Sequence, residues 1–222
     1  MLTPTTYLVN NQLILRALNN IPVDTFRIGI NEPTGDFFYD PWTLSNEFVD
    51  TAWGELYNSI DMPDKGEARI IKLNGGECYI SHADIDDRYH LNLSGEKCYL
   101  INLNDETMHG LQCEGIWYTM NAGSRHSACN LGNKIRYQIV IRKLLNKNVL
   151  EDPVPVTLVT NIDKDDARYL FDNTLSGPLN HANKQGLIND FKFLSNSNVS
   201  FNLERSMYNE MLKILPKEFG IV

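Results

Sequence analysis

Short apolar runs separated by turn signals dominate the middle of the chain, from Ala68 to Leu145. Each run is long enough for one strand, and Gly, Asn and Asp residues occupy the breaks between runs. About seven strands at this spacing are typical of an antiparallel sandwich or barrel. The expected strands are 68–73, 79–82, 88–93, 98–103, 115–120, 127–131 and 135–145.

A different pattern precedes this region at residues 45–60, where apolar residues recur every three or four positions. This period predicts an amphipathic helix whose apolar face packs on the outside of a sheet. Ser45 is the expected N-cap, and Glu47 lies near the positive end of the helix dipole. Residues 6–30 fit either short strands or a strand and a helix, and residues 31–44 indicate a loop.

A charged, proline-containing stretch follows the last expected strand, and the pattern then becomes helical. Helices are expected after the capping residue Asp163, through 187–194 and through 203–215. We therefore predict a β-rich domain with its N-terminal helix over 1–150 and a helical C-terminal extension over 151–222. The sequence leaves open whether the extension covers a pocket or forms a homodimer contact.

Composition narrows the class of protein. With 222 residues, 42% hydrophobic content and a formal net charge of −8, the chain can bury a sizeable core. It is not expected to bind nucleic acid in general. No signal peptide is evident, and no apolar run approaches the ~20 residues that span a membrane. The four cysteines form no CxxC pair and are expected to be reduced thiols. A soluble, cytoplasmic protein is predicted.

The segment Ser81-His82-Ala83-Asp84 places an imidazole and a carboxylate two residues apart. On a strand, residues two apart share a face and can bind one metal ion. Two histidines and one carboxylate are the ligand set of non-haem Fe(II) centres with open coordination positions. The third ligand has to come from elsewhere in the sequence, and the candidates are His90, His109, His126 and His181.

We favour His126 because Arg136 follows ten positions later, within an apolar strand. A buried arginine is costly unless it meets an anion or another partner, and its planar guanidinium binds a carboxylate at two points. A metal with an inward-facing arginine nearby suits a cosubstrate with two carboxylates. The same residues also have a structural interpretation, as core histidines, a solvated acidic turn at Asp84 and an ion pair. Further candidates for the pocket are Tyr79, Tyr89, Trp117, Tyr118 and Asn130.

Together these motifs resemble the Fe(II)/2-oxoglutarate-dependent dioxygenases, and within that superfamily the aspartyl/asparaginyl β-hydroxylase-like group. The resemblance covers roughly residues 66–145. Relatives that act on free proline keep a His-x-Asp motif, as this chain does, whereas the aspartyl β-hydroxylase itself lacks the carboxylate ligand. Gly75 is a departure, because many of these enzymes have proline before the glycine. The matching positions are Gly76 to Asp84, Arg88 to Leu91, Gly123, His126, Asn130 and Arg136.

The resemblance implies that the iron ligands and catalytic residues are His82, Asp84 and His126. It makes Arg136 the residue that binds the distal carboxylate of 2-oxoglutarate, with Arg88 and His90 as further cosubstrate-binding residues. The implied activity is hydroxylation of an amino acid or of a peptide or protein side chain. The implied fold class is α+β with a mainly β core: a double-stranded β-helix, the jelly roll of the cupins, with flanking helices.

Two other functions are left open. A cupin-type metal enzyme, such as an isomerase, would use His82 and His126 without 2-oxoglutarate. A non-catalytic jelly-roll binding module would use the same residues only for packing. Succinate formation coupled to 2-oxoglutarate consumption distinguishes the dioxygenase from the first alternative. Metal affinity that survives replacement of both histidines by alanine would favour the second.

Overall fold

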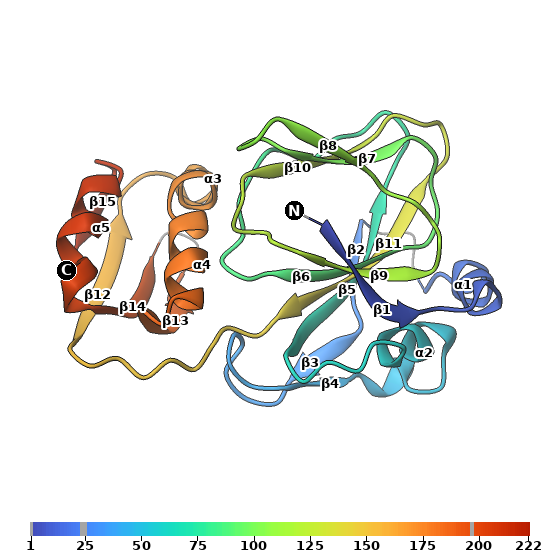
Figure 1. Ribbon diagram of the computed structural model, residues 1–222, viewed down its shortest axis with the longest axis horizontal. Helices are drawn as coiled ribbons and strands as arrows, with labels where there is room; N and C mark the ends of the chain where they lie inside the picture. Colours follow the sequence, from blue (N-terminus) through green and yellow to red (C-terminus); the bar gives the residue numbers. More distant parts are fainter. Residues whose placement is uncertain (1, 23–25, 196–197) are drawn as a thin grey trace. The chain divides into compact units, whose positions relative to one another are not determined.

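The computed structural model describes residues 2–22, 26–195 and 198–222 (Figure 1). The chain forms two compact units, and both contain antiparallel β-sheets. The first unit consists of Met1–Ser81, Asp87–Asn121 and His126–Leu144. The second consists of His82–Asp86, Ala122–Arg125 and Leu145–Val222. The domain boundary expected after residue 150 stays a prediction.

The first unit contains a six-stranded and a three-stranded antiparallel sheet, which face one another in Figure 1. The larger sheet has the order β1-β9-β6-β11-β5-β2, and the smaller has the order β10-β7-β8. The strands of the larger sheet are β1 Leu2–Leu8, β2 Arg27–Gly29, β5 Lys65–Leu73, β6 Arg88–Asn92, β9 Ile116–Met120 and β11 Arg136–Lys143. Those of the smaller sheet are β7 Cys98–Asn102, β8 Thr107–Gly110 and β10 His126–Asn130.

Strand pairing in this unit follows one long hairpin that is rolled onto itself. Its tip is the turn between β7 and β8. Moving outward, β6 pairs with β9, Cys78 bridges Cys129 on β10, and β5 pairs with β11. These successive pairs fall alternately in the smaller and the larger sheet. A ribbon rolled in this way is a jelly roll, so the predicted double-stranded β-helix is confirmed.

Helices α1 (Asn11–Leu18) and α2 (Ala52–Asn58) cover one face of the six-stranded sheet. Alternate strand residues on that face join the helices in a single buried hydrophobic cluster, which lowers the free energy of the fold by removing apolar surface from water. Its members include Ile14, Trp53, Leu56, Ile70, Tyr89, Leu91, Trp117, Ile139 and Ile141. Because strand side chains alternate between faces, the residues in between face the three-stranded sheet.

The helix expected over 45–60 is interrupted, so that prediction is wrong in its extent. Residues Asn46–Phe48 form the 3-10 helix η1, and α2 begins only after Thr51. The Thr51 hydroxyl accepts a hydrogen bond from Gly54 N at 3.2 Å and donates to Phe48 O at 2.8 Å. A threonine side chain that satisfies nearby backbone groups in this way favours a new helix start over a continuous helix. The expected cap Ser45 makes no side-chain capping bond.

Several short elements also differ from expectation. Residues 31–44, predicted as a loop, include the paired strands β3 (Asn31–Pro33) and β4 (Trp42–Leu44). The predicted strand 79–82 is not formed as a continuous strand, because isolated bridges at Cys78 and His82 are the pairing that occurs in this stretch. Strand β8 was not predicted, since its sequence Thr-Met-His-Gly lacks an apolar run.

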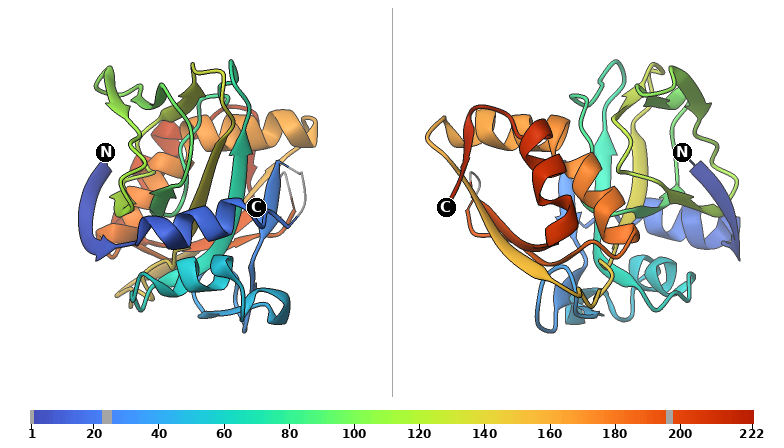
Figure 2. Two further views of the ribbon diagram at one scale, coloured as in Figure 1. Left: turned by 90° about the vertical axis from the view of Figure 1, so that its right-hand side faces the viewer. Right: turned by 60° about the vertical axis from the view of Figure 1, so that its left-hand side comes forward.

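The second unit is built on the antiparallel sheet β13-β14-β12-β15 with three α-helices, which Figure 2 shows in orange to red. The strands are β12 Pro153–Thr160, β13 Ile188–Phe193, β14 Val199–Glu204 and β15 Phe219–Ile221. The helices are α3 Lys164–Thr174, α4 Ser176–Lys184, the 3-10 helix η2 Arg205–Met207 and α5 Tyr208–Ile214. Among the described residues, no helix is long and apolar enough to cross a membrane.

A β-bulge explains why the helix predicted over 187–194 is wrong. That segment is strand β13, and its register shifts between Asn189 and Lys192. The shift lets Ile188 and Phe191, three positions apart, both be buried. An apolar spacing of three therefore imitates the helical period. The helix capped by Asp163 is confirmed as α3, and α5 occupies part of the segment 203–215.

Candidate metal centre and pocket

His82, Asp84 and His126 form a group of side chains that could hold a metal ion. Each offers one ligand atom, and these atoms all lie within 4.8 Å of one another. His82 Nε2 is 3.9 Å from Asp84 Oδ2, and His126 is buried. Two imidazoles and one carboxylate at this spacing fit a divalent metal ion, and this donor set suits Fe(II).

Backbone hydrogen bonds fix the segment that carries His82 and Asp84, although it is not the strand that was expected. Ala83 N donates to Asp172 O and Asp84 N donates to Ala122 O, each at 2.8 Å. His126 is the first residue of β10, where its position is fixed by pairing with Asn102.

Glycine at position 123 is required by a close approach of chain segments just before His126. A Cβ atom at Gly123 would lie 2.6 Å from Asn180 Oδ1, which is closer than van der Waals contact allows. Gly177 packs in the same place, because a Cβ there would lie 2.5 Å from Gly123 O. The turn that leads into His126 is therefore specified by glycine on sterics alone.

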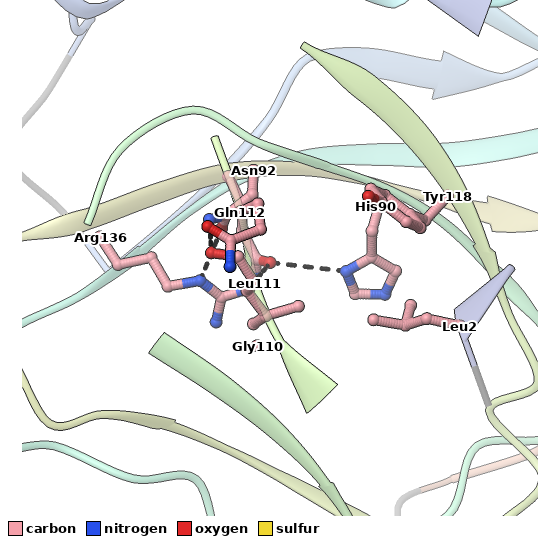
Figure 3. A pocket seen from close by; sticks show the side chains of 9 residues that line it. Leu2, His90, Asn92, Gly110, Leu111, Gln112, Tyr118 and Arg136 are labelled. Carbon is pink, nitrogen blue, oxygen red and sulfur yellow. Dashed lines mark hydrogen bonds between the residues drawn. The ribbon is translucent and has the colours of Figure 1, made fainter. Parts of the chain in front are cut away.

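A small pocket that is partly open to solvent lies on the face of the six-stranded sheet opposite the helix-covered cluster, and Figure 3 shows the side chains that line it. Its polar lining comes from alternate residues of β6 and β11, which share one sheet face. The lining residues are Leu2, His90, Asn92, Gly110, Leu111, Gln112, Tyr118, Arg136 and Gln138. The interior of the roll is thus polar where the helix-covered face is apolar.

Arg136 is the most deeply buried charge of this pocket, with 2% of its surface exposed. Its Nε donates to Asn92 Oδ1 at 2.8 Å, and its Nη2 donates to Gln138 Oε1. Nη1 is buried and has no hydrogen-bond partner among the described residues. Burial lowers the pKa of the guanidinium. A buried donor left unsatisfied is costly, so this atom is available to a hydrogen-bond acceptor in the pocket.

His90 lies at the same pocket in neutral form. Burial, followed by the charges of Arg136 and Arg88, lowers the pKa of His90 to about 3. Its Nδ1 is 3.4 Å from Gln138 Oε1, which already accepts from Arg136, so Nδ1 carries the proton. Its Nε2 is buried without a partner among the described residues and is left as an acceptor. Figure 3 shows the guanidinium and the imidazole at one cavity.

A second polar group on the same sheet face combines four arginines with one glutamate. Glu67 pairs with Arg69, and Arg142 Nε lies 3.1 Å from Glu67 Oε2. Burial lowers the pKa of Arg69, Glu67 opposes this shift, and the charges of Arg27 and Arg88 add to it. Among these five residues the guanidinium charges outnumber the carboxylate. This group could not be recognised in the sequence, because its members lie on four different strands.

The remaining sequence candidates divide between the pocket and the scaffold. Tyr118 lines the pocket, whereas Tyr89 and Trp117 belong to the hydrophobic cluster on the other sheet face. The pocket lining does not include Arg88, which belongs to the group of four arginines and Glu67 described above. Asn130 supports a turn, because its Nδ2 donates to Leu73 O at 3.0 Å and to Lys134 O at 2.8 Å.

Three solved structures show how far the fold is shared. A prolyl-4-hydroxylase from Pseudomonas putida is 14% identical, with a TM-score of 0.40 over 64% of this chain and 92% of that chain. The viral collagen prolyl hydroxylase of Paramecium Bursaria Chlorella virus-1, in a 2OG complex, is 10% identical, with a TM-score of 0.40 over 64% and 94%. CapF is 18% identical with a TM-score of 0.31, and the match covers 39% of this chain but 27% of CapF.

No protein-family model matches the sequence, and no curated protein matches it. At the identities and TM-scores found, the structural likenesses concern the fold and carry no argument about activity.

Proposed function

We propose that this protein is an Fe(II)- and 2-oxoglutarate-dependent dioxygenase that hydroxylates an amino acid or a peptide or protein side chain. The observation that carries the proposal is the convergence of His82, Asp84 and His126 within 4.8 Å. The unsatisfied guanidinium of Arg136 supports the choice of cosubstrate. Within the class we propose the aspartyl/asparaginyl β-hydroxylase-like group, because of the His-x-Asp motif and the downstream histidine and arginine.

In this proposal His82, Asp84 and His126 would hold Fe(II). The bound iron would supply the reaction of O2 with 2-oxoglutarate that ends in hydroxylation of the substrate. Arg136 binds the distal carboxylate of the cosubstrate through Nη1, the donor that has no partner among the residues that the structure describes. Asn92 and Gln138 hold the guanidinium in place through its other nitrogens, so its orientation is set before the cosubstrate arrives.

The test is an anaerobic titration of Fe(II) and 2-oxoglutarate, followed by the weak visible charge-transfer band that such a complex gives. Wild-type protein should develop the band, and His82→Ala and His126→Ala should abolish metal binding. Matched controls are His109→Ala and His181→Ala, which remove a histidine elsewhere in the chain. Metal affinity that persists in both His82→Ala and His126→Ala would contradict the assignment of the site.

The same titration separates the proposal from a cupin-type enzyme that does not use 2-oxoglutarate. Such an enzyme would bind the metal through the same residues without binding 2-oxoglutarate. A dioxygenase should form succinate in step with 2-oxoglutarate consumption once a substrate is supplied. Metal binding without any 2-oxoglutarate binding would therefore overturn the choice of cosubstrate while leaving the metal site intact.

A further inference from the structure

Two cysteines, Cys78 and Cys129, face one another across an antiparallel bridge and have no role in the proposed reaction. The backbone hydrogen bonds on either side of them, each 2.9 Å long, are Tyr79 N to Ala128 O and Asn130 N to Glu77 O. Since these bonds flank the cysteines, the two residues form a non-hydrogen-bonded pair. In such pairs the Cα atoms are about 4.5 Å apart. This separation falls within the range of roughly 4.4–6.8 Å that disulfides require.

The two thiols differ in access. Cys78 is exposed, whereas Cys129 is buried. Burial, followed by the interaction with the Cys78 thiol and its charge, raises the pKa of Cys129 to about 11. One thiol is thus open to solutes, and the other is buried across the bridge from it.

We propose that Cys78 and Cys129 form an oxidisable dithiol, which a peroxide converts to a disulfide and a thiol reductant restores. The pairing geometry carries this inference, because the backbone already holds the two residues at disulfide distance. It does not depend on the proposed dioxygenase activity. The other two cysteines, Cys98 and Cys113, are not paired across strands in this way.

The reaction begins at the accessible thiol. The Cys78 thiolate attacks hydrogen peroxide, so that an S–O bond forms, the O–O bond breaks and water leaves after protonation. Cys129 then attacks the sulfenic sulfur, which forms the S–S bond and releases a second water. Two electrons pass from the sulfurs to the peroxide. Because oxidised Cys78 is no longer anionic, one cause of the raised pKa of Cys129 disappears before the second step.

The bridge would anchor a sparsely held segment. Residues 74–78 are exposed, and the segment is bound to β10 by a few hydrogen bonds such as Ser127 Oγ to Tyr79 O at 2.6 Å. Cys78 lies four positions before His82, and Cys129 lies three positions after His126. The odd spacing from His126 puts Cys129 on the opposite face of β10, so the disulfide does not enter the metal site.

The test uses the full chain, reduced, freed of reductant and exposed to hydrogen peroxide. Wild-type protein should lose two titratable thiols and about 2 Da of mass, and digestion should release one peptide pair that joins Cys78 to Cys129. The reductant should reverse both changes. The oxidised form should also have the higher Tm, because the cross-link closes a long loop in the unfolded chain.

Matched variants locate the bridge. Cys78→Ser and Cys129→Ser should each fail to form it, whereas Cys113→Ser, which removes a different exposed thiol, should form it as wild type does. If Cys129→Ser does not fold, the exposed Cys78→Ser still decides the question. A disulfide that involves Cys98 or Cys113, or oxidation of single thiols with no cross-link, would overturn the proposal.

Discussion

The two faces of the six-stranded sheet have opposite chemistry, although the same strands supply both. On β6 and β11, Tyr89, Leu91 and Ile139 enter the hydrophobic cluster beneath helices α1 and α2. On the other face, His90 and Arg136 line a pocket with buried nitrogens that lack partners among the described residues. The polar face of an antiparallel sheet is commonly solvated, whereas Arg136 and Gln138 on this polar face are buried.

The two faces contribute to stability with opposite signs. Apolar burial on the helix-covered face lowers the free energy of the folded state, whereas an unsatisfied buried Arg136 donor raises it by about 1–3 kcal/mol. Such a cost is common at ligand sites, where the ligand supplies the missing partner. Substitutions on the two faces should therefore affect different measurements: stability for one, ligand binding for the other.

The largest effect is expected on the apolar face. Trp117→Ala should lower the free energy of unfolding by about 3–5 kcal/mol, because the side chain is fully buried and the change leaves a cavity. The variant also loses the hydrogen bond from Trp117 Nε1 to Ser59 Oγ, at 2.8 Å. Urea denaturation measures the loss. Val149→Ala, at a position that is 93% exposed, is the control and should unfold as wild type does. A loss below about 1 kcal/mol for Trp117→Ala would contradict the assignment of this face as core.

The fold could be predicted from the sequence because apolar runs mark the strands and turn residues mark the breaks between them. The apolar runs gave β5, β6, β7, β9, β10 and β11 with boundaries close to those observed. The prediction failed where one feature imitates another. The bulge in β13 gives Ile188 and Phe191 a helical spacing, and the Thr51 cap divides a pattern that looked like one helix. Neither hydrogen bonding nor register can be read from apolar spacing.

The second prediction concerns the polar face. Arg136→Met should weaken 2-oxoglutarate binding by about 100-fold, which is about 2.7 kcal/mol, because the carboxylate loses a charged, oriented donor. Stability should change little, since the removal of a buried, partly unsatisfied charge is offset by the loss of the hydrogen bonds to Asn92 and Gln138. Calorimetric titration and urea denaturation measure the two effects. Lys134→Met removes an exposed positive charge two positions away and should bind as wild type does. Equal affinities in all three proteins would mean that Arg136 does not contact the cosubstrate.

The polar pocket was only partly predictable from the sequence. His90 and Arg136 were identified, whereas Asn92 and Gln138, which hold the guanidinium, were not. The signal was present, because polar residues alternate with apolar ones through Arg88-Tyr89-His90-Leu91-Asn92. What the sequence does not contain is the register of β6 against β11, and it is this register that places Asn92 opposite Gln138.

The third prediction follows from the lowered pKa of His90. In the folded state that pKa is about 3, whereas an unfolded histidine has a pKa near 6.5. Unfolded chains therefore take up a proton below pH 6.5 that folded chains do not, so stability falls as the pH decreases. At pH 5.5 this contribution is about 1.4 kcal/mol relative to pH 7.5.

Comparison with His90→Gln isolates that contribution from the other titrating groups. Wild-type protein should lose about 1.4 kcal/mol more than the variant between pH 7.5 and pH 5.5, as measured by urea denaturation at both values. Identical pH dependence in the two proteins would show that His90 is accessible to protons in the folded state.

The smallest effects should come from a matched pair of tyrosines on neighbouring strands. Tyr89→Phe removes a hydrogen bond from the hydroxyl to Asp64 Oδ1, at 2.6 Å, and should cost about 1 kcal/mol of stability without changing ligand binding. Tyr118→Phe, on the pocket face, should leave stability within about 0.5 kcal/mol and change only the affinity for 2-oxoglutarate. If Tyr89→Phe weakens 2-oxoglutarate binding, or if Tyr118→Phe lowers stability, then the apolar face also affects binding or the polar face also affects stability. Because each change removes one oxygen atom, the pair measures that division with little disturbance of packing.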